Sequence, residues 1–201
     1  MHFNWSTVSR GVPYLQSKNR VASQSVTEHV EPSNWAQGPS LLEITDMTDY
    51  RCVAIRTEDA ERFRRAAKDD FGHRIQRLTS DRSYPCRHCL REASAKNGML
   101  LLSYQTPKPQ SVYGQPTAVF LCAHACEQFE QPNTIADIVN NRLVSFRAFQ
   151  GDGMMIYDAN RIGEGGNYDP IVRTIFARDD VAYINAHTAK AGCLLCHIER
   201  A

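Results

Sequence analysis

Apolar residues recur at regular intervals only from Tyr50 onward. Residues 1–48 are polar and irregular, with breakers at Pro32 and Pro39 and no sustained period of 2 or 3.6 residues. The later part of the chain alternates strand-like and helix-like patterns up to its carboxyl end. We therefore expect a flexible polar extension over residues 1–48 and a single folded domain over residues 49–201.

The first half of the predicted domain contains strands and one amphipathic helix. Thr57 is a candidate cap for the helix, whose apolar positions continue to Phe71 before Gly72 ends it. Acidic residues lie in its first turn and basic residues later, as the helix dipole favours. The predicted strands are Tyr50–Ile55, Leu100–Tyr104 and Ala118–Cys122.

The second half reads as hairpins separated by short helices. Asp169 is a candidate cap for a helix with Pro170 at its first position, where a missing N–H is harmless. Because hairpins join antiparallel strands, we expect an α+β fold with a mostly antiparallel sheet and helices packed on one face. The remaining predicted elements are a helix over Thr134–Asn141, strands over Leu143–Gln150 and Met154–Asp158 around a turn at Gly151–Gly153, and strands over Val181–Thr188 and Cys193–Arg200 around a turn at Ala189–Gly192.

Composition and charge narrow the function classes. The 201 residues are 42% apolar and carry a formal net charge of +1. That balance lacks the basic excess typical of a nucleic-acid-binding protein. The longest apolar runs, such as residues 99–102, are too short to span a membrane, and the amino terminus does not resemble a secretory signal. We therefore expect a cytoplasmic protein whose seven cysteines are metal ligands, catalytic thiols or buried thiols rather than disulfides.

Two C-x-x-C pairs are the main candidate chemistry. Cys86 with Cys89 and Cys193 with Cys196 together supply the four thiolates of a tetrahedral zinc site. The first pair follows Pro85 in a predicted loop and can turn both sulfurs to one side. The second pair lies on a predicted strand, where residues three apart face opposite ways unless a bulge intervenes. Buried free thiols are the alternative for all four.

Other readings of the cysteines remain open. Cys193 to His197 spells the C-x-x-C-H haem-attachment pattern, but a final strand without an export signal makes haem an unsuitable cofactor. Cys122 and Cys126 form a looser pair for which burial is favoured over metal binding. In a thiol enzyme, Cys86 would be the catalytic nucleophile or redox residue, because nearby positive charge favours thiolate, and His88 or His187 would be the base.

The predicted terminal hairpin places histidines beside cysteines. A two-residue turn would set His187 on the face of Cys196, whereas a three-residue turn would move it to the face of Cys193 and His197. A cross-strand pair on a partly exposed face is the simpler interpretation. Arg147 interrupts an otherwise apolar strand, so it either faces solvent or clamps an anion such as a carboxylate.

Several of these segments carry a family resemblance. They are Pro85-Cys86-Arg87, Leu100–Tyr104, Ser145–Phe149, Asp152–Met155, Val181–Tyr183 and His187–Cys193, followed by Ile198–Ala201. In this order they resemble the bacterial domain-of-unknown-function family 1203 over residues 50–201. The resemblance implies a small cytosolic α+β domain without an established activity.

The resemblance also separates the cysteines. It matches Cys86, Arg87 and Cys193 to positions that many members share, whereas Cys89 and Cys196 belong to a subgroup. Where the family pattern reads Asn-Ala-Lys-Pro-Gly-Cys, this chain has Thr188 and Ala191 instead of the Asn and the Pro. A role that depends on that Asn does not carry over to this chain.

These observations lead to two function hypotheses and one weaker alternative. The first is a cytosolic domain that binds a small ligand or a metal ion at a cysteine-centred site, with Arg87, Tyr104 and Arg147 as candidate ligand-binding residues. The second is a thiol-dependent enzyme acting on a small acidic metabolite. A protein-interaction module using residues 1–48 is the third, and no motif supports it.

Overall fold

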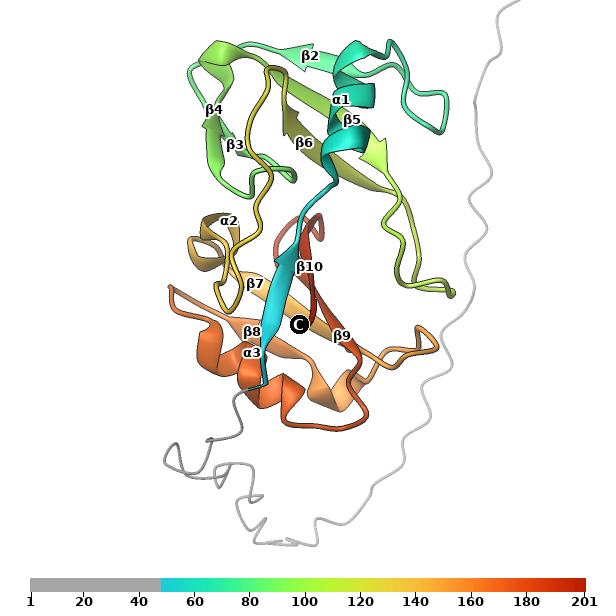
Figure 1. The fold of residues 1–201 in the computed structure, drawn as a ribbon, viewed down its shortest axis with the longest axis vertical. Helices are drawn as coiled ribbons and strands as arrows, with labels where there is room; N and C mark the ends of the chain where they lie inside the picture. The colour runs from blue at the N-terminus through green and yellow to red at the C-terminus, as the bar shows by residue number, and fades with distance from the viewer. Residues whose placement is uncertain (1–47) are drawn as a thin grey trace, which may run out of the picture. The chain divides into compact units, whose positions relative to one another are not determined.

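The computed structural model describes residues 48–201, so the predicted polar extension lies outside the described residues except for its last position. The described chain forms mostly antiparallel sheets with three α-helices, in agreement with the α+β class (Figure 1). No helix within residues 48–201 combines the length and apolar content that a membrane span requires.

A five-stranded antiparallel sheet contains both ends of the described chain. The first four residues of β9 are all buried, which suits a central strand covered on both faces. The carboxyl-terminal hairpin forms as predicted, with a turn closed by the Gly192 N–H donating to the Thr188 carbonyl. In spatial order the strands are β1 (Tyr50–Val53), β10 (Leu194–Arg200), β9 (Tyr183–Thr188), β7 (Val144–Phe149) and β8 (Arg161–Gly163).

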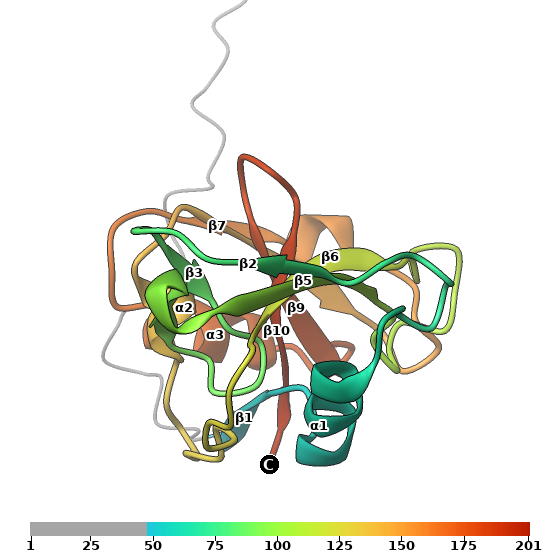
Figure 2. The ribbon, with the colours of Figure 1, turned by 90° about the horizontal axis from the view of Figure 1, so that it is seen from above.

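Two smaller sheets occupy the other end of the domain. Their order is β2 (Gln76–Leu78), β5 (Met99–Tyr104) and β6 (Thr117–Cys122) in one, and β3 (Ser83–Pro85) with β4 (Glu92–Ser94) in the other. Figure 2, which looks onto this end, shows β2, β5 and β6 lying over β9 and β10. The central pair β5 and β6 was predicted, whereas β2, β3 and β4 have only three residues each and show no period of two.

The helices divide between two hydrophobic clusters. In α3 (Asp169–Phe176), Val172, Ile175 and Phe176 pack on the five-stranded sheet, together with α2 (Asp137–Asn140). In α1 (Thr57–Arg65), Ala60 and Phe63 pack with β5 and β6 instead. The expected packing of all helices on one face is therefore not confirmed. Two 3₁₀ turns complete the elements, η1 (Ala95–Asn97) and η2 (Tyr157–Ala159).

Two predicted helices are shorter than their sequence patterns. α1 ends at Arg65 because Ala66 is extended, and Asp69 then accepts backbone hydrogen bonds from Phe71 and His73 in a local turn. Its N-cap is Arg56, not Thr57, whose hydroxyl is used elsewhere. The predicted helix over Thr134–Asn141 is formed only over α2.

The predicted return strand over Met154–Asp158 does not form. Met155 makes a single bridge to Phe149, and the chain then turns through η2 before β8 pairs with β7. Asn160 explains why the strand begins later in the chain than predicted. Its side-chain Oδ1 accepts a hydrogen bond from the backbone N–H of Ala148 at 2.8 Å and takes the place of a strand partner. The strand therefore starts only at Arg161.

A close approach at Gly163 yields a stability prediction. A Cβ at this position would lie 2.6 Å from Tyr168 Cε1 and 3.0 Å from Phe146 Cε2, and both rings are buried. The Tyr168 hydroxyl is held by the Arg142 carbonyl at 2.6 Å, so the ring cannot withdraw freely. We expect Gly163→Ala to lower the free energy of unfolding by about 1–3 kcal/mol. Urea denaturation would measure it, with Gly151→Ala as a control because that site is open.

Candidate metal centre

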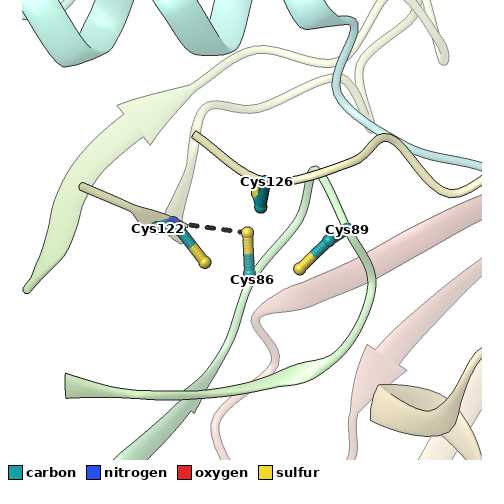
Figure 3. A group of neighbouring side chains, drawn as sticks. All are labelled: Cys86, Cys89, Cys122 and Cys126. Atoms are coloured by element: carbon teal, nitrogen blue, oxygen red, sulfur yellow. Dashed lines mark hydrogen bonds between the residues drawn. The ribbon is translucent and has the colours of Figure 1, made fainter. Parts of the chain in front are cut away.

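Four cysteines from two separate segments come together in the half of the domain built around β5 and β6. Cys86 and Cys89 lie in the loop after β3, Cys122 ends β6, and Cys126 lies in the loop that follows (Figure 3). Their sulfur atoms all lie within 4.8 Å of one another. Three of the side chains are buried and Cys126 is half-buried. This arrangement offers four sulfur ligands to one metal ion.

The loop carrying the first pair is a tight knuckle, defined here as Cys86 to Arg91. It is closed by the Cys86 N–H, which donates to the Arg91 carbonyl at 3.0 Å. Leu90 takes a positive φ of 50°, which is uncommon for a residue with a branched side chain. Its side chain is fully buried in the cluster of the five-stranded sheet, and that burial offsets the backbone cost.

The knuckle backbone connects segments that are distant in sequence. Arg87 donates to the Phe120 carbonyl at 2.9 Å and accepts from the Ile55 N–H at 2.8 Å. The His88 carbonyl accepts from the Phe129 N–H, and the Leu90 carbonyl accepts from the Ile138 N–H. The knuckle is thus a junction between β6, the segment before α1 and the chain leading into α2.

Hydrogen-bond donors surround the sulfur atoms. The backbone N–H of Cys122 donates to Cys86 Sγ at 3.3 Å, shown as the dashed line in Figure 3. Arg64 donates to Cys126 Sγ at 3.3 Å, and His88 Nδ1 lies 3.2 Å from the same sulfur. The Thr57 hydroxyl donates to Gln128 Oε1 at 3.0 Å, and its oxygen lies 3.1 Å from the other ring nitrogen of His88. Donors to sulfur stabilise its anionic form.

The close sulfur atoms share protons unequally. Hydrogen bonding, chiefly with Cys122 and next with Cys126, lowers the pKa of Cys86 and lowers that of Cys89 to about 7. The pKa of Cys122 is raised, because its thiol is the proton donor to these neighbours and is buried. The cluster therefore already favours thiolate on the knuckle, which is the form that binds a metal.

The predicted second pair lies elsewhere. Cys196 is buried in the other hydrophobic cluster, together with Cys52. Cys193 is half-buried at the terminal hairpin, with its backbone N–H bonded to Thr188. A register shift between Leu194 and Cys196 turns Cys196 toward the Ala186 side of the sheet. The structure therefore brings Cys86 and Cys89 together with Cys122 and Cys126, not with the C-x-x-C of the last strand.

The remaining predicted site residues line two cavities under the loop between β5 and β6. Arg87, Tyr104 and His197 line one of about 120 Å³, whose walls are mostly apolar. Arg147 and His187 line a second of about 200 Å³. Cys86 lines neither cavity and has no exposed surface. The register pairs His187 with Leu194 and Asn185 with His197, so both histidines share this face of the sheet.

Arg87 is a buried cation held by carbonyl groups. Its Nε donates to the Leu194 carbonyl at 2.8 Å, and its Nη1 donates to the Pro85 carbonyl. Burial lowers the pKa of Arg87 to about 10. The side chain ties the start of β10 to the segment that enters the knuckle, which makes it a structural link as well as a cavity wall.

One of three comparisons with known proteins identifies a family. The model of a protein family of unknown function, DUF1203, matches residues 83–200. The chain belongs to this family. The matched segment contains the knuckle, Cys122, Cys126 and both cavity-lining strands of the terminal hairpin, so the DUF1203 region includes the complete thiol cluster. Searches of curated proteins and of solved structures returned no match.

His197 provides a pH-dependence prediction. Its Nδ1 lies 2.8 Å from Asn185 Oδ1, and burial lowers its pKa from 6.5 to about 4 despite Glu199 nearby. The unfolded chain therefore binds this proton first as the pH falls. The contribution of neutral His197 to the free energy of unfolding is complete above about pH 6.5 and is lost as the pH falls toward 4. Over this range it changes the free energy of unfolding by at most about 1.4 kcal/mol per pH unit.

Unfolding free energies at pH 7 and pH 5 would test this titration. We expect His197→Asn, which keeps a donor toward Asn185, to lose less stability over this interval than the parent protein. Comparing the two proteins cancels the contribution of cysteine protonation, which both share. An identical loss in parent and variant would show that His197 does not titrate in this window.

Proposed function

We propose that this protein is a zinc-binding domain in which a single structural Zn²⁺ is held by Cys86, Cys89, Cys122 and Cys126. The observation that carries the proposal is the convergence of four sulfur atoms within 4.8 Å. A tetrahedral site with zinc–sulfur bonds of about 2.3 Å has sulfur atoms about 3.8 Å apart. The side chains would need to close by only about an ångström, which small rotamer adjustments provide.

The surroundings of the cluster favour a bound metal over a free reactive thiol. Four thiolates around Zn²⁺ carry a net charge of −2, which the guanidinium of Arg64 offsets at Cys126. The backbone N–H of Cys122 supplies a neutral donor to Cys86, and the His88 ring lies against Cys126. A nucleophile must also reach its substrate, and Cys86 is fully buried. These features support metal binding more strongly than the thiol-enzyme hypothesis.

The place of the site in the fold supports a structural role. Closed four-cysteine sites leave no coordination position for a substrate and stabilise the fold directly. Here the ion would join the knuckle to the end of β6, while the knuckle backbone holds the segments before α1 and α2. A metal at this junction would fix the arrangement of both hydrophobic clusters. Thiols in this state require a reducing compartment, in keeping with a cytosolic location.

Metal analysis of the purified full-length chain tests this proposal. Protein purified without chelator is expected to contain about one zinc per chain by plasma mass spectrometry. Replacement by Co²⁺ should produce visible bands of tetrahedral geometry and near-ultraviolet thiolate-to-metal charge transfer. Stoichiometric iron instead of zinc would retain the site but overturn the metal assignment. No stoichiometric metal, and no uptake of Co²⁺ by the reduced protein, would overturn the proposal itself.

A further inference from the structure

The second cavity has the composition of an anion site. Its polar lining includes Arg147, Asn185, His187, Gln115 and Thr117, and none of its lining residues is acidic. Arg147 is half-buried on β7, directly opposite Asn185 on β9. Within residues 48–201, no carboxylate pairs with its guanidinium and no hydrogen bond holds it. An arginine partly withdrawn from water with all its donors available is suited to binding an anion.

Asn185 adds a donor with a fixed orientation. Its residue is 3% exposed, and its Oδ1 is occupied by His197 Nδ1 at 2.8 Å. The side-chain NH₂ is therefore the group left for a ligand in the cavity, beside the guanidinium of Arg147. Two strands of a central sheet hold these donors, so the pair is positioned without the cost of ordering a loop.

His187 limits what the ligand can be. Its Nδ1 lies 2.9 Å from the Gly192 carbonyl and must carry a proton to donate there. Burial, and the positive charge of Arg147, lower the pKa of His187 to about 4. The ring is thus neutral near pH 7, and the cavity contains one positive charge, from Arg147. That charge matches a monoanion better than the dianion of a phosphate.

The rest of the lining is apolar, and Phe149 and Leu194 share the sheet face of Arg147 and Asn185. Phe149, Leu194, Pro109 and Met155 belong to this apolar lining, and Tyr113 from the loop between β5 and β6 packs edge-on against Phe149 with ring centroids 6.1 Å apart. Ser111 fastens the same loop to the Gly153 carbonyl at 2.8 Å. A ligand in this space would contact hydrogen-bond donors of the sheet and the apolar side chains beside them.

We propose that this cavity binds a small organic monocarboxylate, with its carboxylate on Arg147 and Asn185 and its apolar body against Phe149 and Leu194. The site is separate from the cysteine cluster, so its occupancy does not depend on the proposed zinc. Its dimensions, about 200 Å³, suit an acid of benzoate or butyrate size. The charged pair would supply orientation and the apolar wall would supply affinity.

Calorimetric titration of the full chain, with its metal content recorded, tests the proposal. Benzoate and butyrate are the probes, benzamide is the neutral isostere of benzoate, and inorganic phosphate is the anion without an apolar body. We expect saturable binding of at least one carboxylate, at least about tenfold weaker binding of benzamide, and weaker binding of phosphate. Phosphate binding as tightly as the carboxylates would overturn the monocarboxylate assignment, and no saturable binding of either acid would overturn the site.

Variants separate the two donors from general effects. Arg147→Gln removes the positive charge, and Asn185→Asp keeps the acceptor for His197 while replacing the NH₂ donor by an anion. Both should weaken carboxylate binding at least about tenfold with metal content and circular dichroism unchanged. Arg82→Gln makes the same charge change at an exposed site away from the cavity and should bind as the parent does. Unchanged affinity in folded Arg147→Gln would overturn the proposal.

Discussion

If the proposed zinc is bound, Cys86→Ser is expected to release it and to lower the free energy of unfolding by more than about 4 kcal/mol. Serine preserves the size of the side chain, but its hydroxyl is not a zinc ligand under ordinary conditions. Binding of zinc to structural sites contributes directly to folding free energy, because the unfolded chain has no assembled site. The three remaining cysteine side chains would then lie close together in a buried site without a metal ion.

The measurement pairs metal content with urea denaturation of the reduced protein. Cys193→Ser is the matched control, because it removes a half-buried thiol of the terminal hairpin that lies outside the cluster. That variant should keep one metal per chain and change the unfolding free energy by less than about 1 kcal/mol. Loss of the metal from Cys193→Ser, or a stable metal-loaded Cys86→Ser protein, would contradict the assignment of ligands.

The long strands were predictable because local patterns determine them. β7 alternates buried and half-buried side chains over most of its length, β9 begins with four buried residues, and β5 with β6 form apolar runs bounded by polar loops. The three-residue strands β2, β3 and β4 have no such pattern, because pairing with a neighbour and not side-chain burial defines them. Their positions depend on contacts made after the chain has folded.

Of the candidate site, the knuckle could be predicted from the sequence, whereas the cysteines that join it were not. The knuckle was correctly expected to bend both sulfur atoms to one side, since Pro85 and a polar loop are local features. Its partners depend on which strand end lies across from it, and the C-x-x-C spacing indicates Cys193 with Cys196, whereas burial is favoured for Cys122 with Cys126. The bridge between Cys86 and Phe120 in β6 decides between them, and it joins residues 34 positions apart.

The spacing of the correct partners was itself a usable signal. Cys122 ends an apolar strand, and Cys126 follows after three polar or small residues, which leaves the chain free to turn. Cys193 is held instead in the hairpin turn by hydrogen bonds with Thr188, and Cys196 is paired with Ala186 of β9. The terminal hairpin therefore keeps these two cysteines away from the knuckle.

Arg87→Met is expected to lower the free energy of unfolding by about 2–3 kcal/mol while leaving the metal bound. Methionine fills a similar length of space but cannot donate to the carbonyls of Leu194 and Pro85, and each buried acceptor without a donor costs about 1–3 kcal/mol. Relief from burying a cation, whose cost is visible in the lowered pKa of Arg87, offsets part of that loss.

This variant distinguishes two kinds of support for the knuckle. Arg87 acts through β10, whereas the thiol cluster acts through β6, so a destabilised protein with full metal content is the expected combination. Arg91→Met removes an exposed arginine of the same loop and should change stability by less than about 0.5 kcal/mol. If Arg87→Met also lost the metal, the link to β10 would be needed to hold the knuckle in its ligand-binding shape, and the two supports would act as one cooperative unit.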